Sequence, residues 1–99
     1  MKITQIIILF FILYNSNAFS QQKYTLSGIV KEASSNESII GVTIFIPELN
    51  TGVSTNEYGF YSITIPSGDY TIQVSSIGFQ ELVQKINLVK NLKIDFNPT

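Results

Sequence analysis

The sequence contains no cysteine, no histidine and no arginine. Without cysteine, the protein forms no disulfides and lacks the lipid-attachment residue of a bacterial lipoprotein. Without cysteine or histidine, it also lacks the usual zinc ligands, the usual base at neutral pH and the usual thiol nucleophile. These absences argue against an enzyme and predict no metal and no cofactor. The fold must therefore be stabilised by packing alone.

Charge is scarce as well. Charged residues make up only 13% of the 99 residues, and the six cations, all of them lysines, nearly balance the seven acids. Proteins that bind nucleic acid need a basic stripe to neutralise phosphates, whereas these lysines are scattered. We therefore exclude nucleic acid as a partner. The hydrophobic content of 44% is typical of one small globular domain, which we expect to be a monomer.

A long apolar run occurs at the N-terminus. Lys2 precedes the run at residues 6–13, and a polar segment with small residues follows it, which is the order of a secretory signal peptide. The run is shorter than the roughly 20 residues that a membrane-spanning helix needs. We predict a signal peptide at residues 1–20, cleaved after Ser20, with cleavage after Ala18 as the alternative. The exported chain, as written, should be soluble in the periplasm.

Apolar and polar residues alternate through much of the remaining chain. Residues 61–65 and 70–74 both alternate and flank the turn-forming sequence PSGD, so we interpret them as a β-hairpin. Pro66 cannot donate a hydrogen bond to a sheet and should end the first strand. Gly68 should supply a positive φ in the turn. The alternation shifts at residues 75–76, which predicts a bulge or the end of a strand.

Further strands are predicted by the same alternation, and the segments between them are rich in asparagine, serine and glycine. These strands lie at residues 24–31, 42–46, 82–88 and 92–96. The chain shows no convincing helical period. About seven short strands in a chain of this size predict an all-β, seven-stranded sandwich of two sheets over residues 21–99.

Five aromatic residues lie between positions 58 and 79. Tyr61, Tyr70 and Phe79 share the inward-facing phase of their strands, so we expect them in the core. Tyr58 and Phe60 lie in a turn or on the opposite phase, which makes them the candidate partner-facing residues. The glycine between these two, Gly59, is expected to take a positive φ in a hairpin turn.

Other polar residues are weaker candidates for chemistry. The serines have no histidine to activate them, and a lysine-activated serine would need Lys85 or Lys90 close by and desolvated. The carboxylates could form a glycosidase pair, but they lie in predicted turns and strand ends, where solvated acids are ordinary. Asn56, Glu57 and Asp69 could bind calcium through their oxygens, but they lack the spacing of a dedicated loop. We predict no catalytic, metal-binding or cofactor-binding residue.

Five motifs in order along the chain resemble the carboxypeptidase regulatory-like domain. They are YTLSGxV at 24–30, GVTIFI at 41–46, TNEYGFY at 55–61, IPSGDY at 65–70 and SxGF at 76–79. The pattern is similar to the copy that follows the signal peptide in many TonB-dependent outer-membrane receptors of Bacteroidetes-type bacteria. This resemblance implies a prealbumin-like or immunoglobulin-like sandwich with an accessory, non-catalytic role.

Two functions therefore remain. The resemblance implies the N-terminal accessory sandwich of a TonB-dependent transport receptor, acting as a spacer or protein-interaction module next to a plug and a barrel. We then expect these 99 residues to be a fragment, and the full receptor to reside in the outer membrane. The alternative is a standalone secreted or periplasmic module that binds carbohydrate or protein through Tyr58 and Phe60.

Overall fold

The computed structural model describes residues 21–99, so the signal peptide predicted at residues 1–20 lies outside the described residues. Within the described part, no helix is long and apolar enough to cross a membrane. Residues 21–99 form seven strands and one short 3-10 helix, which follow one another in sequence. They are β1 (Lys23–Ile29), β2 (Thr43–Ile46), η1 (Pro47–Leu49), β3 (Thr51–Ser54), β4 (Phe60–Pro66), β5 (Gly68–Ser75), β6 (Leu82–Leu88) and β7 (Leu92–Lys93).

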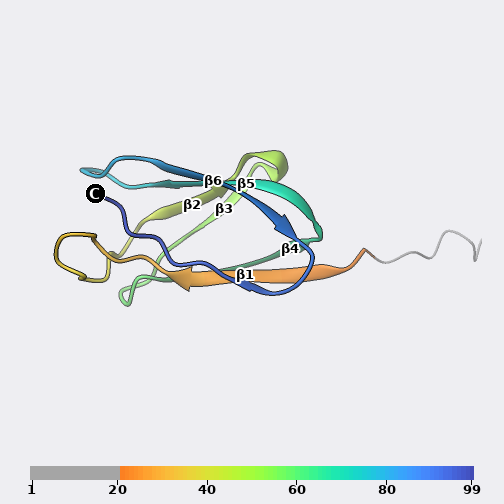
Figure 1. Ribbon diagram of the computed structural model, residues 1–99, viewed down its shortest axis with the longest axis horizontal. Helices are drawn as coiled ribbons and strands as arrows, with labels where there is room; N and C mark the ends of the chain where they lie inside the picture. The colour runs from red at the N-terminus through yellow and green to blue at the C-terminus, as the bar shows by residue number, and fades with distance from the viewer. Residues whose placement is uncertain (1–20) are drawn as a thin grey trace, which may run out of the picture.

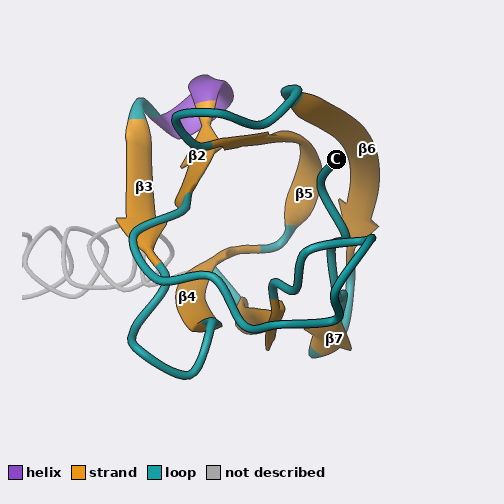
Figure 2. Ribbon diagram, turned by 90° about the vertical axis from the view of Figure 1, so that its left-hand side faces the viewer, coloured by secondary structure: helices purple, strands orange, loops and turns teal. Residues whose placement is uncertain are grey.

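The strands form two sheets that face each other, as Figures 1 and 2 show. The three-stranded sheet has the order β4-β1-β7, with β1 antiparallel to β4 and parallel to β7. The four-stranded sheet has the order β3-β2-β5-β6, and all its neighbours are antiparallel. The predicted seven-stranded all-β sandwich is therefore confirmed.

Strands β4 and β5, which the sequence predicted as a hairpin, do not pair with each other. β4 pairs with β1, with Lys23 opposite Pro66, whereas β5 pairs with β2 and β6. Between them Ser67 carries the chain from one sheet to the other. Alternation reports that a strand is half-buried but does not identify its partner, because consecutive strands can also face each other across a core. The hairpin prediction was wrong for this reason, although β4 does end at Pro66 and β5 at Ser75.

The core lies between the two sheets and consists of buried, mainly aliphatic side chains. Its members are Leu26, Val30, Val42, Ile44, Ile46, Tyr61, Ile65, Tyr70, Ile72, Val74, Leu88 and Phe96. Tyr61 and Tyr70 are in this core as predicted, with only 1% and 8% of their surfaces exposed. Phe79 is not: it is half-buried in the loop after β5. Its core assignment was wrong because β5 ends before the alternation reaches it.

Side chains as well as backbone groups hold the last strand against β1. β7 has only two residues, where the alternation predicted a strand over 92–96. The Asn91 Oδ1 atom accepts a hydrogen bond from the Thr25 N–H at 2.9 Å, and the Asp95 Oδ1 atom accepts one from the Ile29 N–H at 2.8 Å. On the side of β1 that faces β7, these side-chain oxygens accept hydrogen bonds that the backbone carbonyls of a longer neighbouring strand would accept. The C-terminal segment therefore follows β1 closely although little of it is regular strand.

Candidate functional site

Three loops meet at the end of the sandwich where β1 finishes (Figure 1). We call this surface the loop end and define it as residues 32–42, 55–59 and 75–81. The Gly41 N–H donates to the Thr55 carbonyl at 3.0 Å, which joins the first two loops. Gly41 and Ile77 line one shallow hollow of about 410 Å³, which places the third loop beside the first. Thr99 lies at the same end, because its carbonyl accepts from the Gln80 N–H at 2.8 Å.

The turn at residues 56–59 is shaped by one asparagine and one glycine. The Asn56 Oδ1 atom accepts from the N–H groups of Tyr58 and Phe60 at 2.9 and 3.0 Å. Gly59 has the predicted positive φ, +75°, and a Cβ there would lie 2.5 Å from the Val30 carbonyl oxygen. Only glycine fits this position without strain. The turn is not a hairpin, however, since it joins β3 of one sheet to β4 of the other.

The loop end exposes large apolar side chains. Tyr58 and Phe60, the residues predicted to face a partner, are 70% and 43% exposed. Their binding role stays a prediction. Two aliphatic residues that the sequence analysis did not single out are exposed there as well, Ile40 at 65% and Ile77 at 102%. The sequence did contain a signal for the exposure of Ile77. The alternation shifts at residues 75–76, which marks the end of β5 and places Ile77 in the loop that follows.

Charge is unevenly distributed between the two ends of the sandwich. Acids outnumber lysines at the loop end, and lysines outnumber acids toward the opposite end, where β1 begins. The loop-end charges are Glu32, Glu37, Glu57 and Glu81, with Lys31 beside them. The charges toward the opposite end are Lys23, Lys85 and Lys90, together with Glu48 and Asp69. Lys93 and Asp95 lie between the two ends, beside Ser27 and Ile29 of β1. The nearly neutral chain is thus divided into an acidic loop end and a weakly basic opposite end.

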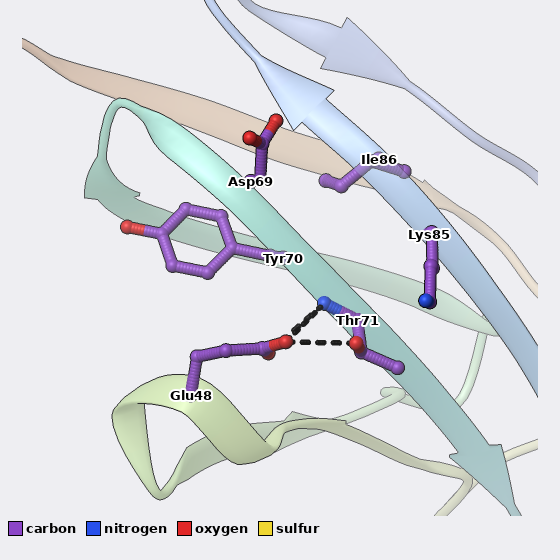
Figure 3. A pocket seen from close by; sticks show the side chains of 6 residues that line it. All are labelled: Glu48, Asp69, Tyr70, Thr71, Lys85 and Ile86. Atoms are coloured by element: carbon purple, nitrogen blue, oxygen red, sulfur yellow. Dashed lines mark hydrogen bonds between the residues drawn. The ribbon is translucent and has the colours of Figure 1, made fainter.

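A second shallow hollow, of about 400 Å³, lies where β2 ends and η1 begins (Figure 3). Its lining residues are Glu48, Asp69, Tyr70, Thr71, Lys85 and Ile86. Glu48 reaches from η1 to β5, where its carboxylate accepts from the Thr71 N–H at 2.9 Å and from the Thr71 hydroxyl at 2.7 Å. The hydrogen bond from the Thr71 N–H has the larger effect and that from the Thr71 hydroxyl the smaller, and both lower the pKa of Glu48 from its ordinary value.

The position of the Glu48 carboxylate follows from where β2 ends. β2 pairs with β5 as far as Phe45 opposite Gln73, and η1 then turns the chain away before it can pair with Thr71. The ladder donor of Thr71 would be left unpaired, and the Glu48 carboxylate takes the place of the missing strand carbonyl. We therefore interpret Glu48 as a side chain that completes the sheet.

The structure separates the oxygen donors that the sequence analysis considered for calcium. Asn56 and Glu57 belong to the loop end, whereas Asp69 lies at the start of β5, near the other end of β4. The Asp69 carboxylate accepts a hydrogen bond from the Asn87 side chain at 2.6 Å. Among residues 21–99, no three acidic, histidine or cysteine side chains gather as metal ligands would. Among the serines, Ser75 lies at the loop end, whereas Lys85 lies opposite Thr71, four residues back along β5.

The remaining turn residues, Pro66 and Gly68, shape the crossover between the sheets. Pro66 ends β4, and its carbonyl accepts a hydrogen bond from the Tyr70 hydroxyl at 2.7 Å. Gly68 has φ +156°, a conformation that other residues rarely adopt. The hydrogen bond from the Tyr70 hydroxyl to a backbone carbonyl four residues upstream is similar to the tyrosine corner of immunoglobulin-like sandwiches. These residues therefore have a structural role in the crossover.

Together, the two facing sheets and the tyrosine-tied crossover define a β-sandwich of the prealbumin-like or immunoglobulin-like class. Residues 26–99 match the sequence model of the CarboxypepD_reg-like domain, and the chain belongs to this family. The family resemblance of the five sequence motifs is thereby confirmed. No curated protein matches the chain.

The solved structures that share this fold include the following two. The TIE protein of Bacillus anthracis superposes with a TM-score of 0.63 and 15% identity, over 77% of this chain and 16% of that one. A chain in a C-terminal interface mutant of the type II cohesin-X-dockerin complex of Acetivibrio cellulolyticus superposes with a TM-score of 0.56 and 20% identity, over 76% of this chain and 55% of that one. At such identities the similarity supports the fold alone, and the present chain spans only part of each.

Proposed function

We propose that this CarboxypepD_reg-like sandwich is the non-catalytic N-terminal accessory module of a TonB-dependent outer-membrane transport receptor. In this role it lies in the periplasm as a spacer or protein-interaction domain. The family membership supports a β-sandwich module, and the order of the five sequence motifs supports the receptor context.

The path of the chain through the sandwich carries the proposal. β1 begins at one end, where Lys23 lies opposite Pro66, and the last residue lies at the other end, where Thr99 is bonded to Gln80 (Figure 1). In a receptor whose signal peptide is removed after Ser20, a domain threaded in this way holds its free N-terminal end one domain length away from the plug. At about 3.3 Å per residue, the seven residues of β1 alone span roughly 23 Å. This geometry suits a spacer that extends away from the plug.

The distribution of exposed residues supports an interaction role alongside the spacing role. The two hollows described above are shallow and open, which is a poor environment for excluding water from a reaction. The loop end, by contrast, exposes Tyr58 and Ile77, and Thr99 lies at the same end. A surface of this kind is suited to contact with another protein.

The receptor assignment can be tested in cells that carry the gene. An antibody raised against residues 21–99 would be used on soluble and outer-membrane fractions, with a strain deleted for the gene as the control. We expect a receptor-sized product in the outer membrane that begins near Gln21. A product of the size of this domain alone, recovered from the soluble periplasm, would contradict the proposal. It would favour a standalone module that binds carbohydrate or protein.

A domain replacement separates the two roles. Residues 21–99 of the receptor would be exchanged for an unrelated β-sandwich of similar length, and uptake would be measured together with the amount of receptor in the outer membrane. Normal uptake would assign the domain a spacer role. Loss of uptake at a normal receptor level would assign it an interaction role.

A further inference from the structure

We propose that the loop end binds a cationic polypeptide segment, anchored by Ile40, Tyr58 and Ile77 and oriented by the surrounding glutamates. This inference rests on the proposed interaction role and names the chemistry of the partner. It does not depend on the receptor context, because a standalone module could use the same surface.

The anchors come from three loops that only the fold brings together. Single exposed hydrophobic residues are common on protein surfaces. Here three large ones, each at least 65% exposed, lie on three separate loops that meet at one end of the sandwich. Ile77 is fully exposed and is followed by Gly78 at φ +89°, which holds the loop in a tight turn. The arrangement therefore has the features of an apolar interaction surface.

The charges around these anchors identify the partner. Glu37 and Glu57 lie in the same loops as Ile40 and Tyr58, and Glu81 follows Ile77 by four residues. Such a surface repels phosphates and anionic lipid headgroups and attracts lysine or arginine. Apolar anchors with an acidic rim thus favour a partner segment that combines cationic and apolar side chains.

The hollow beside Ile77 adds hydrogen-bond acceptors to this surface. It is lined by Thr43, Ser75 and Ser76 as well as by Gly41 and Ile77. The three hydroxyl oxygens can accept hydrogen bonds from an ammonium or guanidinium group. A cationic side chain placed here would lie next to an apolar anchor, which is the combination that the proposed partner presents.

The test uses the protein purified after expression of the 99-residue chain, together with three synthetic peptides of equal length carrying a fluorescent label. The first alternates lysine and leucine, the second glutamate and leucine, and the third lysine and serine. Binding would be measured by fluorescence anisotropy at low and at high salt. We expect the lysine–leucine peptide to bind about tenfold more tightly than either of the others, and its affinity to fall as salt rises.

Variants locate the binding surface. Ile77→Ser and Ile40→Ser should each weaken binding of the lysine–leucine peptide about tenfold, the usual scale for an apolar anchor. Val83→Ser is the matched control, because Val83 is 60% exposed but lies on β6 outside the loop end. The double variant Glu37→Gln with Glu57→Gln should reduce the salt dependence. Unfolding midpoints would verify that each variant keeps its fold.

Three results would overturn the inference. Equal binding of the lysine–leucine and glutamate–leucine peptides would exclude the acidic rim as a determinant. Equal losses for Ile77→Ser and Val83→Ser would place binding elsewhere. Self-association of the chain without peptide, abolished by Ile77→Ser, would identify a second copy as the occupant. None of these results bears on the receptor assignment, which the fractionation experiment tests separately.

Discussion

The Tyr61 hydroxyl on β4 donates a hydrogen bond to the backbone carbonyl of Ile94 at 2.6 Å, passing over the strand that lies between them. That strand is β1, and Gly28 is the residue opposite Tyr61 in the pairing. A Cβ at Gly28 would lie 1.8 Å from the Ile94 oxygen and 3.0 Å from the Tyr61 ring. The missing side chain thus lets Tyr61 on β4 reach across β1 to the segment that directly follows β7.

Substitution of Gly28 by alanine should destabilise the protein. The added methyl group would displace either the Ile94 carbonyl or the Tyr61 ring, and such overpacking costs about 1–3 kcal/mol. Urea denaturation followed by circular dichroism measures the change. Ser27→Ala, at the neighbouring position of β1, is the control and should shift the free energy of unfolding by less than about 0.5 kcal/mol. An unchanged midpoint for Gly28→Ala would contradict the close approach of Ile94.

The Tyr61 hydroxyl can be tested apart from its ring. Burial, and secondarily the charge of Asp95, raises the pKa of Tyr61 well above its ordinary value, so the hydroxyl remains a donor. Tyr61→Phe keeps the ring but leaves the Ile94 carbonyl without this donor, which should cost about 1–3 kcal/mol. The same change at Tyr58, which is 70% exposed, should have little effect on denaturation. Equal midpoints for the two variants would disprove the role of the hydroxyl.

Tyr70 should contribute both packing and a hydrogen bond. Tyr70→Ala removes a ring that is 8% exposed, and we expect a loss of about 3–5 kcal/mol, enough to unfold much of the population of so small a domain. Tyr70→Phe removes only the bond to the Pro66 carbonyl and should cost about 1 kcal/mol. Calorimetric or urea midpoints would rank the two variants. A Tyr70→Ala protein as stable as the wild type would refute the core assignment.

Glu48 should make stability depend on pH in the acidic range. Folding lowers its pKa below 4.5, so its contribution is fully present above the pKa of the unfolded chain and disappears as the pH falls through the folded-state pKa. Glu48→Gln should therefore be less stable than the wild type at pH 7, and the difference should vanish in strong acid. Unfolding midpoints between pH 2 and 7 would show this convergence. Glu81→Gln removes one acid elsewhere on the surface and serves as control.

Gly41 and Gly59 have the same φ, so substitutions at them allow the cost of backbone strain to be measured apart from the cost of a close contact. Gly41 and Gly59 both have φ +75°, but a Cβ at Gly41 has nothing within 4 Å, whereas one at Gly59 meets the Val30 carbonyl oxygen at 2.5 Å. Gly41→Ala should cost about 1–2 kcal/mol from backbone strain alone. Gly59→Ala should cost more, because a close contact is added to the same strain. Equal losses in urea denaturation would show that the contact at Gly59 relaxes freely.

Local features of the sequence predicted much of the fold. Alternation identified where most strands lie, because a strand that buries one face needs apolar side chains at every second position. Pro66 ended its strand as expected, since it cannot donate to the ladder. Five ordered motifs were sufficient to indicate the family. All of these signals act within a few residues of one another, which is why they can be read without the structure.

Sheet pairing could not be read in the same way. β4 and β5 alternate perfectly on either side of a turn, yet they lie in different sheets, because burial against the facing sheet produces the same pattern as burial within a hairpin. Phe79 follows the inward phase but lies beyond the end of β5. The role of Gly28 likewise became visible only when Ile94, from the far end of the chain, was placed against it.

The sequence by itself therefore determined the class of fold, the family and the exclusion of histidine and cysteine chemistry. Tertiary structure alone decided which exposed side chains share one end of the sandwich. Ile40, Tyr58 and Ile77 lie far apart along the chain, and the glutamates beside them carry no local pattern of their own. These residues form one surface because successive strands, whether paired in one sheet or facing each other across the core, run back and forth along the sandwich and return the chain to the same end. No short stretch of sequence encodes this long-range constraint.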